Sequence, residues 1–298
     1  HGTDNSTDRL INVAGHTIGG GGTIGLTGPG GASGMPGTLA LTNYGLIEAT
    51  TPTRLDLSLS SGINAGVMQA REGGTLLLSR GALDNTGGTF QALAGSTAMI
   101  SGGTLMGGQV LAQTGGTVDI GGAGGTGGAR VPLLGGGIQS ASVTALNGGV
   151  VLLQGGILKD STLTTQGSGV SRWVAGMVEN VTVNGNAQLN GEAYTALSGT
   201  ITNHGTIALN GASTLQYWQS GTRLLIDGQV TLAGSGQVLL SDSAYNYIGG
   251  VHGTDNSTDR LINVAGHTIG GGGTIGLPGP GWASGMLGTL ALSNAGLI

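Results

Sequence analysis

The sequence predicts an all-β fold, a parallel β-solenoid (β-helix) with coils of about 20 residues. Three observations predict it. Gly accounts for 66 of the 298 residues, whereas Lys and Arg together number 9 and Asp and Glu number 14. An Asn-x-Gly motif followed by a short β-like run occurs at Asn43, Asn64 and Asn85, each 21 residues after the last. Short runs of alternating apolar and polar residues lie between the Gly-rich turns, as in short strands.

The composition excludes several other classes. The chain is 38% hydrophobic and 8% charged with a mean hydropathy of +0.21, whereas disordered chains are charged and poor in apolar residues. Collagen needs Gly at every third position and abundant Pro, but this chain has 6 Pro and no such period. Helical proteins carry strong helix formers on exposed surfaces, and the sequence has a single Lys, Lys159.

The first expected elements are short strands that begin after a Gly. Gly22-Thr23-Ile24 and Gly37-Thr38-Leu39 open a series of Gly-Thr-apolar elements, in which the Gly ends a tight turn. The Gly/Pro-rich stretch TGPGGASGMPG (27–37) follows the first of them, so we expect an outward loop there, within a Gly-rich loop region that spans 19–37. Thr38-Leu39-Ala40-Leu41 alternates with period two, as one side of a coil does. Gly reaches the left-handed conformations that corners require, which explains its abundance.

The Asn-x-Gly motif is expected to mark one corner of the coil. If an Asn recurs at the same corner, its side-chain amide can bond to the Asn above and below and form a ladder that satisfies the buried turn. We therefore predict a structural turn or ladder role for five residues: Asn43, Asn64, Asn85, Asn203 and Asn294.

Two later regions are expected to interrupt the pattern. Residues 121–137 are too Gly-rich for a clean coil and resemble a loop with a short strand inside it. Residues 235–259 are irregular and hold much of the polar density, so we interpret them as a junction. Between the two regions, strand-like runs such as Gln229-Val230-Thr231-Leu232 continue the solenoid.

A long repeat organises the whole chain. Residues 1–47 return at 252–298 with a constant offset of 251, and five of the 47 positions differ. We interpret residues 1–251 as one unit of a tandem array and 252–298 as the start of the next copy; the alternative is a local duplication in a two-copy protein. At about 20 residues per coil and about 4.8 Å between coils, one unit would make roughly 12 coils and a rod roughly 60 Å long. The differing positions are Thr27/Pro278, Gly31/Trp282, Pro36/Leu287, Thr42/Ser293 and Tyr44/Ala295.

Charge and hydropathy limit the partners that we expect. The net charge is −5 and the few cations are scattered, whereas nucleic acid binding needs several cations on one face. The apolar runs are far shorter than the roughly 18 residues of a membrane span. The chain shows no signal segment, so we expect any secretion signal to lie outside it. Expected partners are copies of the same unit, end to end and side by side, and surface glycans.

The stretches LTNYGLIEA, LIDGQVTLAGSGQVLLSDSAYNYIGG and LINVAGHTIGGGGTIG resemble the repetitive β-solenoid regions of giant bacterial surface and secreted proteins. They are similar to filamentous-haemagglutinin-type adhesins and to autotransporter passenger segments. The resemblance lies in the pattern of Gly, Asn and Thr along nearly the whole chain. It implies an extracellular or cell-surface location and a role in adhesion, matrix or filament formation.

The search for chemistry gives no catalytic, cofactor or metal site. Carboxylate pairs that a coil could bring together, such as Glu48 with Glu72 and Asp56 with Asp84, have spacings of 24 and 28 residues that do not match one coil. Asp4-Asn5-Ser6-Thr7-Asp8, which returns at 255–259, offers oxygen ligands for calcium, but neither the EF-hand loop nor the GGxGxDxUx nonapeptide is present. An Asx-rich turn is the alternative interpretation of that segment.

Together these features predict a non-enzymatic protein. We expect the structural shaft of an extracellular bacterial fibre or giant adhesin, built of tandemly repeated β-solenoid units. The alternative is a carbohydrate-binding or carbohydrate-active β-helix, since parallel β-helices also include lyases and glycosidases.

Overall fold

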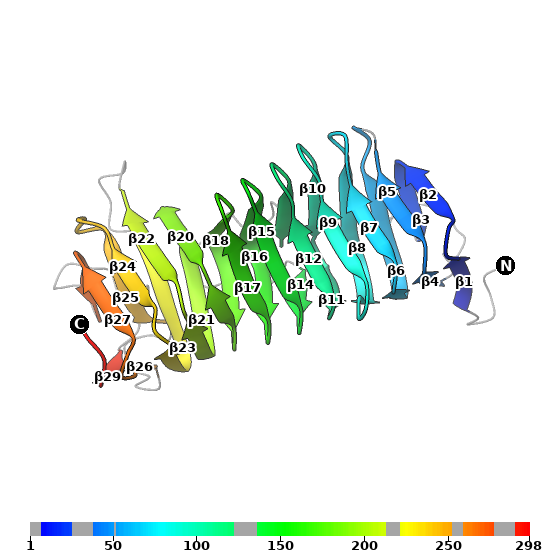
Figure 1. The fold of residues 1–298 in the computed structure, drawn as a ribbon. Coiled ribbons are helices and arrows are strands. Elements are labelled where there is room, and N and C mark those ends of the chain that lie inside the picture. The colour runs from blue at the N-terminus through cyan, green and yellow to red at the C-terminus, as the bar shows by residue number, and fades with distance from the viewer. Residues whose placement is uncertain are drawn as a thin grey trace, which may run out of the picture.

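The computed structural model describes residues 7–25, 38–50, 52–121, 136–212, 221–251, 259–276 and 290–298. These residues form 29 strands of one continuous sheet and contain no helix. Each strand pairs in parallel with strands of the coils before or after it. Figure 1 shows an elongated stack of coils with the two termini at opposite ends. The predicted parallel β-solenoid is confirmed.

The pairings arrange the strands in three columns, A, B and C, which the chain visits in that order in every coil. Column A contains β1 (Thr7–Asn12), β4 (Thr38–Asn43), the second halves of β6 (Leu55–Asn64) and β8 (Thr75–Asp84), β11 (Gly103–Met106), β14 (Gly137–Gln139), the second halves of β16 (Val150–Lys159) and β18 (Val170–Glu179), the first halves of β21 (Tyr194–Asn203) and β23 (Thr222–Ala233), β25 (Asn246–Gly250) and β28 (Thr274–Ile275).

Column B follows a sharp corner in the early coils. It contains β2 (Thr17–Gly20), β5 (Leu46–Ala49), β7 (Val67–Ala70), β9 (Thr89–Ala92), β12 (Gln109–Ala112), β15 (Ser142–Leu146), β17 (Thr162–Gln166), β19 (Thr182–Asn184), the second halves of β21 and β23, β26 (Arg260–Asn263) and β29 (Ala291–Asn294).

Column C completes each coil. It contains β3 (Gly22–Gly25), the first halves of β6 and β8, β10 (Thr97–Ile100), β13 (Thr117–Ile120), the first halves of β16 and β18, β20 (Asn186–Gly191), β22 (Thr206–Gly211), β24 (Gln237–Leu240) and β27 (Thr268–Gly271).

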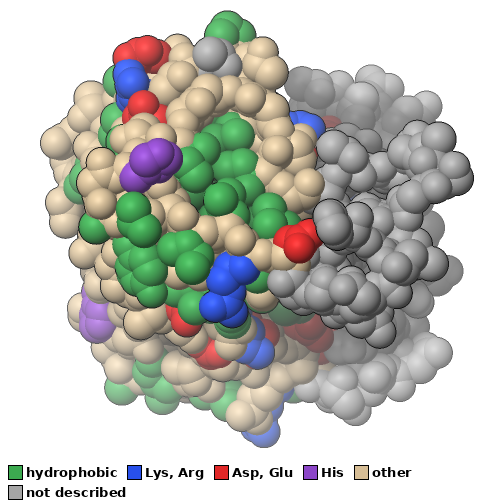
Figure 2. Space-filling view, turned by 90° about the vertical axis from the view of Figure 1, so that its right-hand side faces the viewer, with side chains coloured by type: hydrophobic (Ala, Val, Ile, Leu, Met, Phe, Trp, Pro, Cys, Tyr) green, Lys and Arg blue, Asp and Glu red, His purple; other side chains and the backbone are tan. Residues whose placement is uncertain are grey.

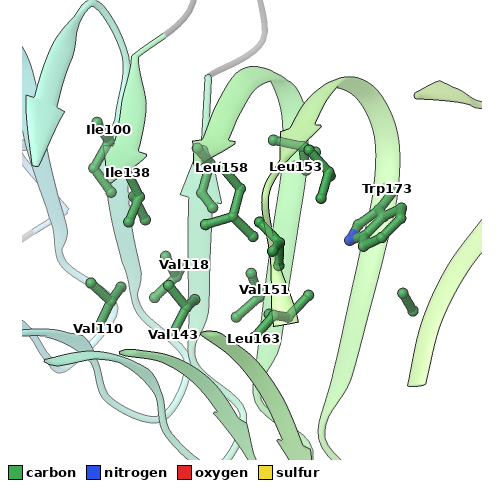
Figure 3. Packing of buried hydrophobic residues seen from close by; sticks show 14 of the residues in the cluster. Ile100, Val110, Val118, Ile138, Val143, Val151, Leu153, Leu158, Leu163 and Trp173 are labelled. Carbon is green, nitrogen blue, oxygen red and sulfur yellow. The ribbon is translucent and has the colours of Figure 1, made fainter. Parts of the chain in front are cut away.

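The core lies inside the coils, because alternate side chains of every column face inward. β7, β9 and β10, for example, alternate between half-buried and buried residues. Val118, Ile138 and Val143 come from columns C, A and B, and all three are at most 1% exposed and face the same interior (Figure 3). Trp173 also points into this core, and its indole Nε1 donates to Ser171 Oγ at 3.0 Å. One continuous apolar cluster therefore runs along the stack.

Coil length varies more than the sequence predicts. Many coils take 20 to 22 residues, as the spacings of cross-coil hydrogen bonds show. Asn12 and Asn43 occupy the same place in successive coils although they are 31 residues apart, and Val110 pairs with Val143. These longer coils contain the two regions expected to form loops, 19–37 and 121–137, of which 26–37 and 122–135 lie outside the described residues. The loop expectation is wrong for the start of the first region, because Gly19 and Gly20 end β2 and Gly22–Gly25 form β3.

The longer coils reduce the number of coils in a unit. β26 repeats the sequence of β1 but lies in column B, the column of β2, which directly follows β1. Ten steps from one strand to the next along column B lead from β2 to β26. A unit therefore makes ten coils and one further column, about 50 Å of rod at about 4.8 Å per coil. The estimate of roughly 12 coils and roughly 60 Å was too high because it gave every coil the minimal length.

The expected junction at 235–259 is also more regular than its sequence indicates. β24 and β25 lie within it and continue columns C and A without a break in pairing. Asn246 is fully buried there, and its Oδ1 accepts a bond from Gly211 N at 2.7 Å. Polar side chains in this region thus hold the coil together from inside.

Candidate functional site: polar columns at the coil corners

A column of buried Asn side chains lines the corner between columns A and B in the first four coils. Asn12 Nδ2 donates to Asn43 Oδ1 at 2.7 Å, Asn43 Nδ2 to Asn64 Oδ1 at 2.7 Å, and Asn64 Nδ2 to Asn85 Oδ1 at 2.6 Å. All four residues are at most 1% exposed. Each side-chain amide also donates to a backbone carbonyl of the next coil, as Asn64 Nδ2 does to Thr89 O at 3.2 Å. The corner therefore holds a continuous amide ladder along the solenoid axis.

The ladder ends at Asn85, where the next coil supplies Gly. Met106 pairs with Asp84, which places Gly107 where a further Asn would stand. Asn85 Nδ2 donates instead to the carbonyls of Gly88, Gly107 and Gln109 at 3.2 to 3.3 Å. The last amide of the ladder is thus satisfied by backbone.

Exposed polar residues replace the buried Asn at this corner in later coils. Ser140, Asp160 and Asn180 occupy successive coils, are exposed, and have φ of 55°, 47° and 52°. Asn180 Nδ2 donates to Asp160 Oδ1 at 3.2 Å. Asn and Asp tolerate the left-handed region better than other L-residues, because their short side chains bond locally. The same corner is therefore closed in two ways along one unit.

Asn203 and Asn294 do not belong to this ladder. They lie at the corner between columns B and C, because β21 and β29 end there. Asn203 pairs with Val183 of the preceding coil and not with an Asn. Its Nδ2 donates to Gln237 O at 3.0 Å and contacts His267 Nε2 at 3.2 Å. Asn294 Oδ1 accepts from Asn263 Nδ2 at 2.8 Å. The expectation of one shared corner for all five Asn is therefore wrong for these two.

His267 joins the parts of this second polar column. Asn203 Oδ1 accepts from Gly205 N, so its Nδ2 faces His267 Nε2, which must be an acceptor. Asn263 Nδ2 donates to Asn294, so its Oδ1 accepts from His267 Nδ1 at 2.7 Å. Both contacts require a neutral ring with its proton on Nδ1. His267 is fully buried, and this burial lowers its pKa.

In four of the five Asn-x-Gly motifs that begin at Asn43, Asn64, Asn85, Asn203 and Asn294, the Gly permits close approach of neighbouring coils. A Cβ on Gly45, Gly66 or Gly296 would lie within 3.0 Å of a carbonyl oxygen in the coil before it, and the same holds for Gly205. None of these four is among the residues with positive φ. Corner Gly was expected to adopt a left-handed backbone, which holds for turn residues such as Gly95 (φ 71°) and for Gly87 (φ 79°), the Gly that follows Asn85, but not for these four.

A second polar row lies on the outer face of column B. Gln69 Nε2 donates to Glu48 Oε2 at 3.0 Å, Gln91 Nε2 to Gln69 Oε1 at 2.9 Å, and Gln113 Nε2 to Gln91 Oε1 at 2.7 Å. Arg71 donates two hydrogen bonds to Glu48, from Nε to Oε2 at 2.8 Å and from Nη2 to Oε1 at 2.9 Å. Hydrogen bonding from Arg71 lowers the pKa of Glu48, against the opposing effect of burial.

The carboxylates considered for catalysis are engaged with neighbours. Arg71 also pairs with Glu72, so one guanidinium brings Glu48 and Glu72 together despite their 24-residue spacing. Asp56 Oδ1 accepts from Ser79 Oγ at 2.5 Å. Within the described ranges, no three His, Cys, Asp or Glu side chains form a group that could hold a metal ion.

The Asp-rich segments weighed for calcium lie largely outside the described residues. Residues 4–6 and 255–258 belong to the undescribed parts of the chain. Of the two acidic residues that are described, Asp8 is exposed and Asp259 is fully buried. Asp259 Oδ1 accepts from Gly228 N at 2.9 Å, a bond between successive coils, so this side chain stabilises the stack instead of capping its own turn.

Sequence reasoning missed two features of these columns. His267 and its copy His16 each lie four residues after an Asn, a spacing with no known motif. The Gln row was detectable, because Gln69, Gln91 and Gln113 recur every 22 residues.

No family model and no curated protein matches the chain. A separate finding concerns membranes: in the part of the chain that is described, no helix has the length and apolar character needed to cross one.

Proposed function

We propose that this chain is a segment of a tandem array of 251-residue units that forms the shaft of an extracellular bacterial fibre or giant adhesin. The observation that carries the proposal is the way the second copy joins the first. β26 and β27 repeat β1 and β2, and they pair in parallel with β23 and β24 of the preceding coil. A unit thus ends on a surface that accepts the beginning of the next one.

Burial of the repeated residues supports the same arrangement. Leu10 and Ile18 are only partly buried at the N-terminal end, whereas their copies Leu261 and Ile269 are at most 1% exposed beneath the preceding coil. Figure 2 shows hydrophobic side chains gathered in the middle of that end face. The same sequence is therefore suited to being covered by a coil like those formed by 222–250.

The function that follows is mechanical. Parallel hydrogen-bond ladders run along the axis and would carry load, while a net charge of −4 per unit, from 8 basic and 12 acidic residues, permits shafts to lie side by side. The extracellular location and the adhesin role rest on the resemblance of the Gly/Asn/Thr pattern to bacterial surface proteins. No catalytic role is proposed.

Electron microscopy tests the proposal. Chains with one, two and four copies of residues 1–251, each ending with 252–298, should form rods that lengthen by about 50 Å per added unit. Compact particles whose length does not grow with unit number would contradict the shaft. Glycan-array binding and glycan cleavage by the same samples would instead favour the carbohydrate-directed alternative.

A further inference from the structure

The second copy does not lie on the same side of the solenoid as the first. β1 lies in column A but its repeat β26 lies in column B. β2 lies in column B and its repeat β27 in column C. β3 lies in column C and the residues that repeat it form β28 in column A. Every described strand of the repeat has moved forward by one column.

The shift arises inside the unit, between the fourth and the ninth coils. In the early coils the long strands β6 and β8 pass from column C into column A, and a buried Asn follows at the A/B corner. In the ninth coil β21 passes from column A into column B, and Asn203 follows at the B/C corner. The pattern of long strand, Asn corner and short strand has thus moved one column onward before the second copy begins.

We propose that successive units of the array each advance by one column, so that the repeated surface follows a threefold screw around the shaft. This rests on the proposed tandem array. Three units, about 750 residues and 31 coils, restore the original column, which gives a full repeat of about 150 Å made of three steps of about 50 Å.

The screw determines which surface a partner can reach. β3 and β4 lie in columns C and A, whereas their copies β28 and β29 lie in columns A and B. Three of the five sequence differences between the copies fall between these strands. A partner that lies straight along the shaft, such as a second shaft, meets the same strand of the unit only at every third unit.

Cysteine pairs test the column shift within the 298-residue chain, which has no Cys of its own. Thr231 of β23 and Ile262 of β26 are paired neighbours within column B, and both are half-buried. Parallel neighbours at this separation satisfy disulfide geometry. Mild oxidation of the Thr231→Cys/Ile262→Cys variant should therefore give the cross-link in most molecules.

In the matched control, the first cysteine lies in column A instead of column B. Tyr247 lies in β25, so the Tyr247→Cys/Ile262→Cys variant should remain reduced under the same conditions. Cross-linking of the control pair together with failure of the first pair would overturn the column shift. Circular dichroism of both reduced variants confirms that the coils have formed.

Labelled arrays test the screw itself. Ala14 and its copy Ala265 are exposed in equivalent turns, at the A/B corner in one copy and at the B/C corner in the next. Gold-maleimide on Ala14→Cys in every unit of a six-unit chain should mark three sides in turn, with a label returning to one side every 150 Å or so. Labels on a single side at about 50 Å would overturn the screw but keep the shaft. Absence of any rod would refute the tandem array instead.

Discussion

The buried Asn residues are the side chains whose removal should cost most at the scale of single residues. Asn64 accepts one bond from Asn43 and donates to Asn85 and to Thr89 O. A buried donor or acceptor that loses its partner costs about 1–3 kcal/mol, because water cannot replace the bond. The middle of the ladder therefore contributes more than its ends, since both of its neighbours depend on it.

We expect Asn64→Ala to lower the free energy of unfolding by about 2–3 kcal/mol, because Asn43 Nδ2 loses its side-chain acceptor and buried Asn85 Oδ1 loses the donor Asn64 Nδ2. The matched control is Asn210→Ala, which breaks the exposed bond from Asn210 Nδ2 to Asn190 Oδ1 and should change stability by less than about 0.5 kcal/mol. Urea denaturation followed by circular dichroism measures both. Equal effects of the two substitutions would show that the buried ladder adds nothing special.

His267 should make stability depend on pH. Burial lowers its pKa from the ordinary value of 6.5, so the unfolded chain takes up the proton first as the pH falls. This contribution is complete above pH 6.5 and is lost on acidification, at up to about 1.4 kcal/mol per pH unit, until the folded ring is protonated too. Unfolding midpoints between pH 8 and 5 measure the loss.

The His267→Gln variant is the control for this pH dependence. Gln carries both a donor and an acceptor but does not titrate, so the decline between pH 6.5 and 5 should become shallower. His16 and His204 remain in that variant and are exposed. An unchanged pH profile would assign the decline to groups other than His267.

Substitution of Thr195 should raise the free energy of unfolding instead of lowering it. Thr195 is fully buried and its Oγ1 has no hydrogen-bond partner. Thr195→Val replaces the hydroxyl with a methyl group of similar size, so we expect a gain of about 1 kcal/mol in the free energy of unfolding. Ser171→Ala is the contrasting control, because it leaves Trp173 Nε1 without its acceptor and should destabilise. A loss of stability in Thr195→Val would contradict this account of the hydroxyl.

At the scale of one coil, the corner glycines determine how closely successive coils approach. A Cβ on Gly66 would lie 2.7 Å from the carbonyl carbon of Tyr44, so Gly66→Ala must displace backbone and should cost about 3 kcal/mol or more. Gly95→Ala is the control: its φ of 71° strains an Ala by about 1 kcal/mol, and nothing lies within 4 Å. Thermal unfolding compares the stability of the two variants. Equal losses of stability would mean that Gly66 is required for its backbone conformation and not for close contact with the preceding coil.

A regular repeat spacing in the sequence predicts the coil and its Asn ladder, but not the number of coils or the corner at which a given Asn lies. The 21-residue spacing of Asn43, Asn64 and Asn85 specifies both the coil and the ladder, because identical residues at one corner stack directly. Coil count was not predictable in the same way, since inserted segments lengthen a coil without adding one. The position of Asn203 depends on the column in which its strand ends, and a local motif does not carry that information.

For the whole molecule, the two copies provide identical sequences in different surroundings. Residues 8–25 and 259–276 are the same in sequence. In the second copy, Val264 N donates to Leu232 O and Thr268 N to Gly236 O, both at 3.1 Å, in the preceding coil. Among the described strands, β1 pairs only with β4 of the coil that follows it, so the first copy is covered from one side. In stacked repeats stability depends on neighbours, so the copies should differ in protection.

Hydrogen exchange measured by mass spectrometry should reveal this difference within a single experiment. Peptides from the two copies have equal mass, so at intermediate times the shared peptide should show two envelopes of about equal size. The fast one comes from the open end and the slow one from the covered coil, since terminal coils open with far less free energy than interior ones. Fusion of a further unit before residue 1 should move the fast envelope to the slow position, because its last coils would cover β1 to β3. Two envelopes that persist unchanged after that fusion would mean that one unit does not cover the beginning of the next, and a single envelope in the original chain would mean that stacking does not protect the repeat.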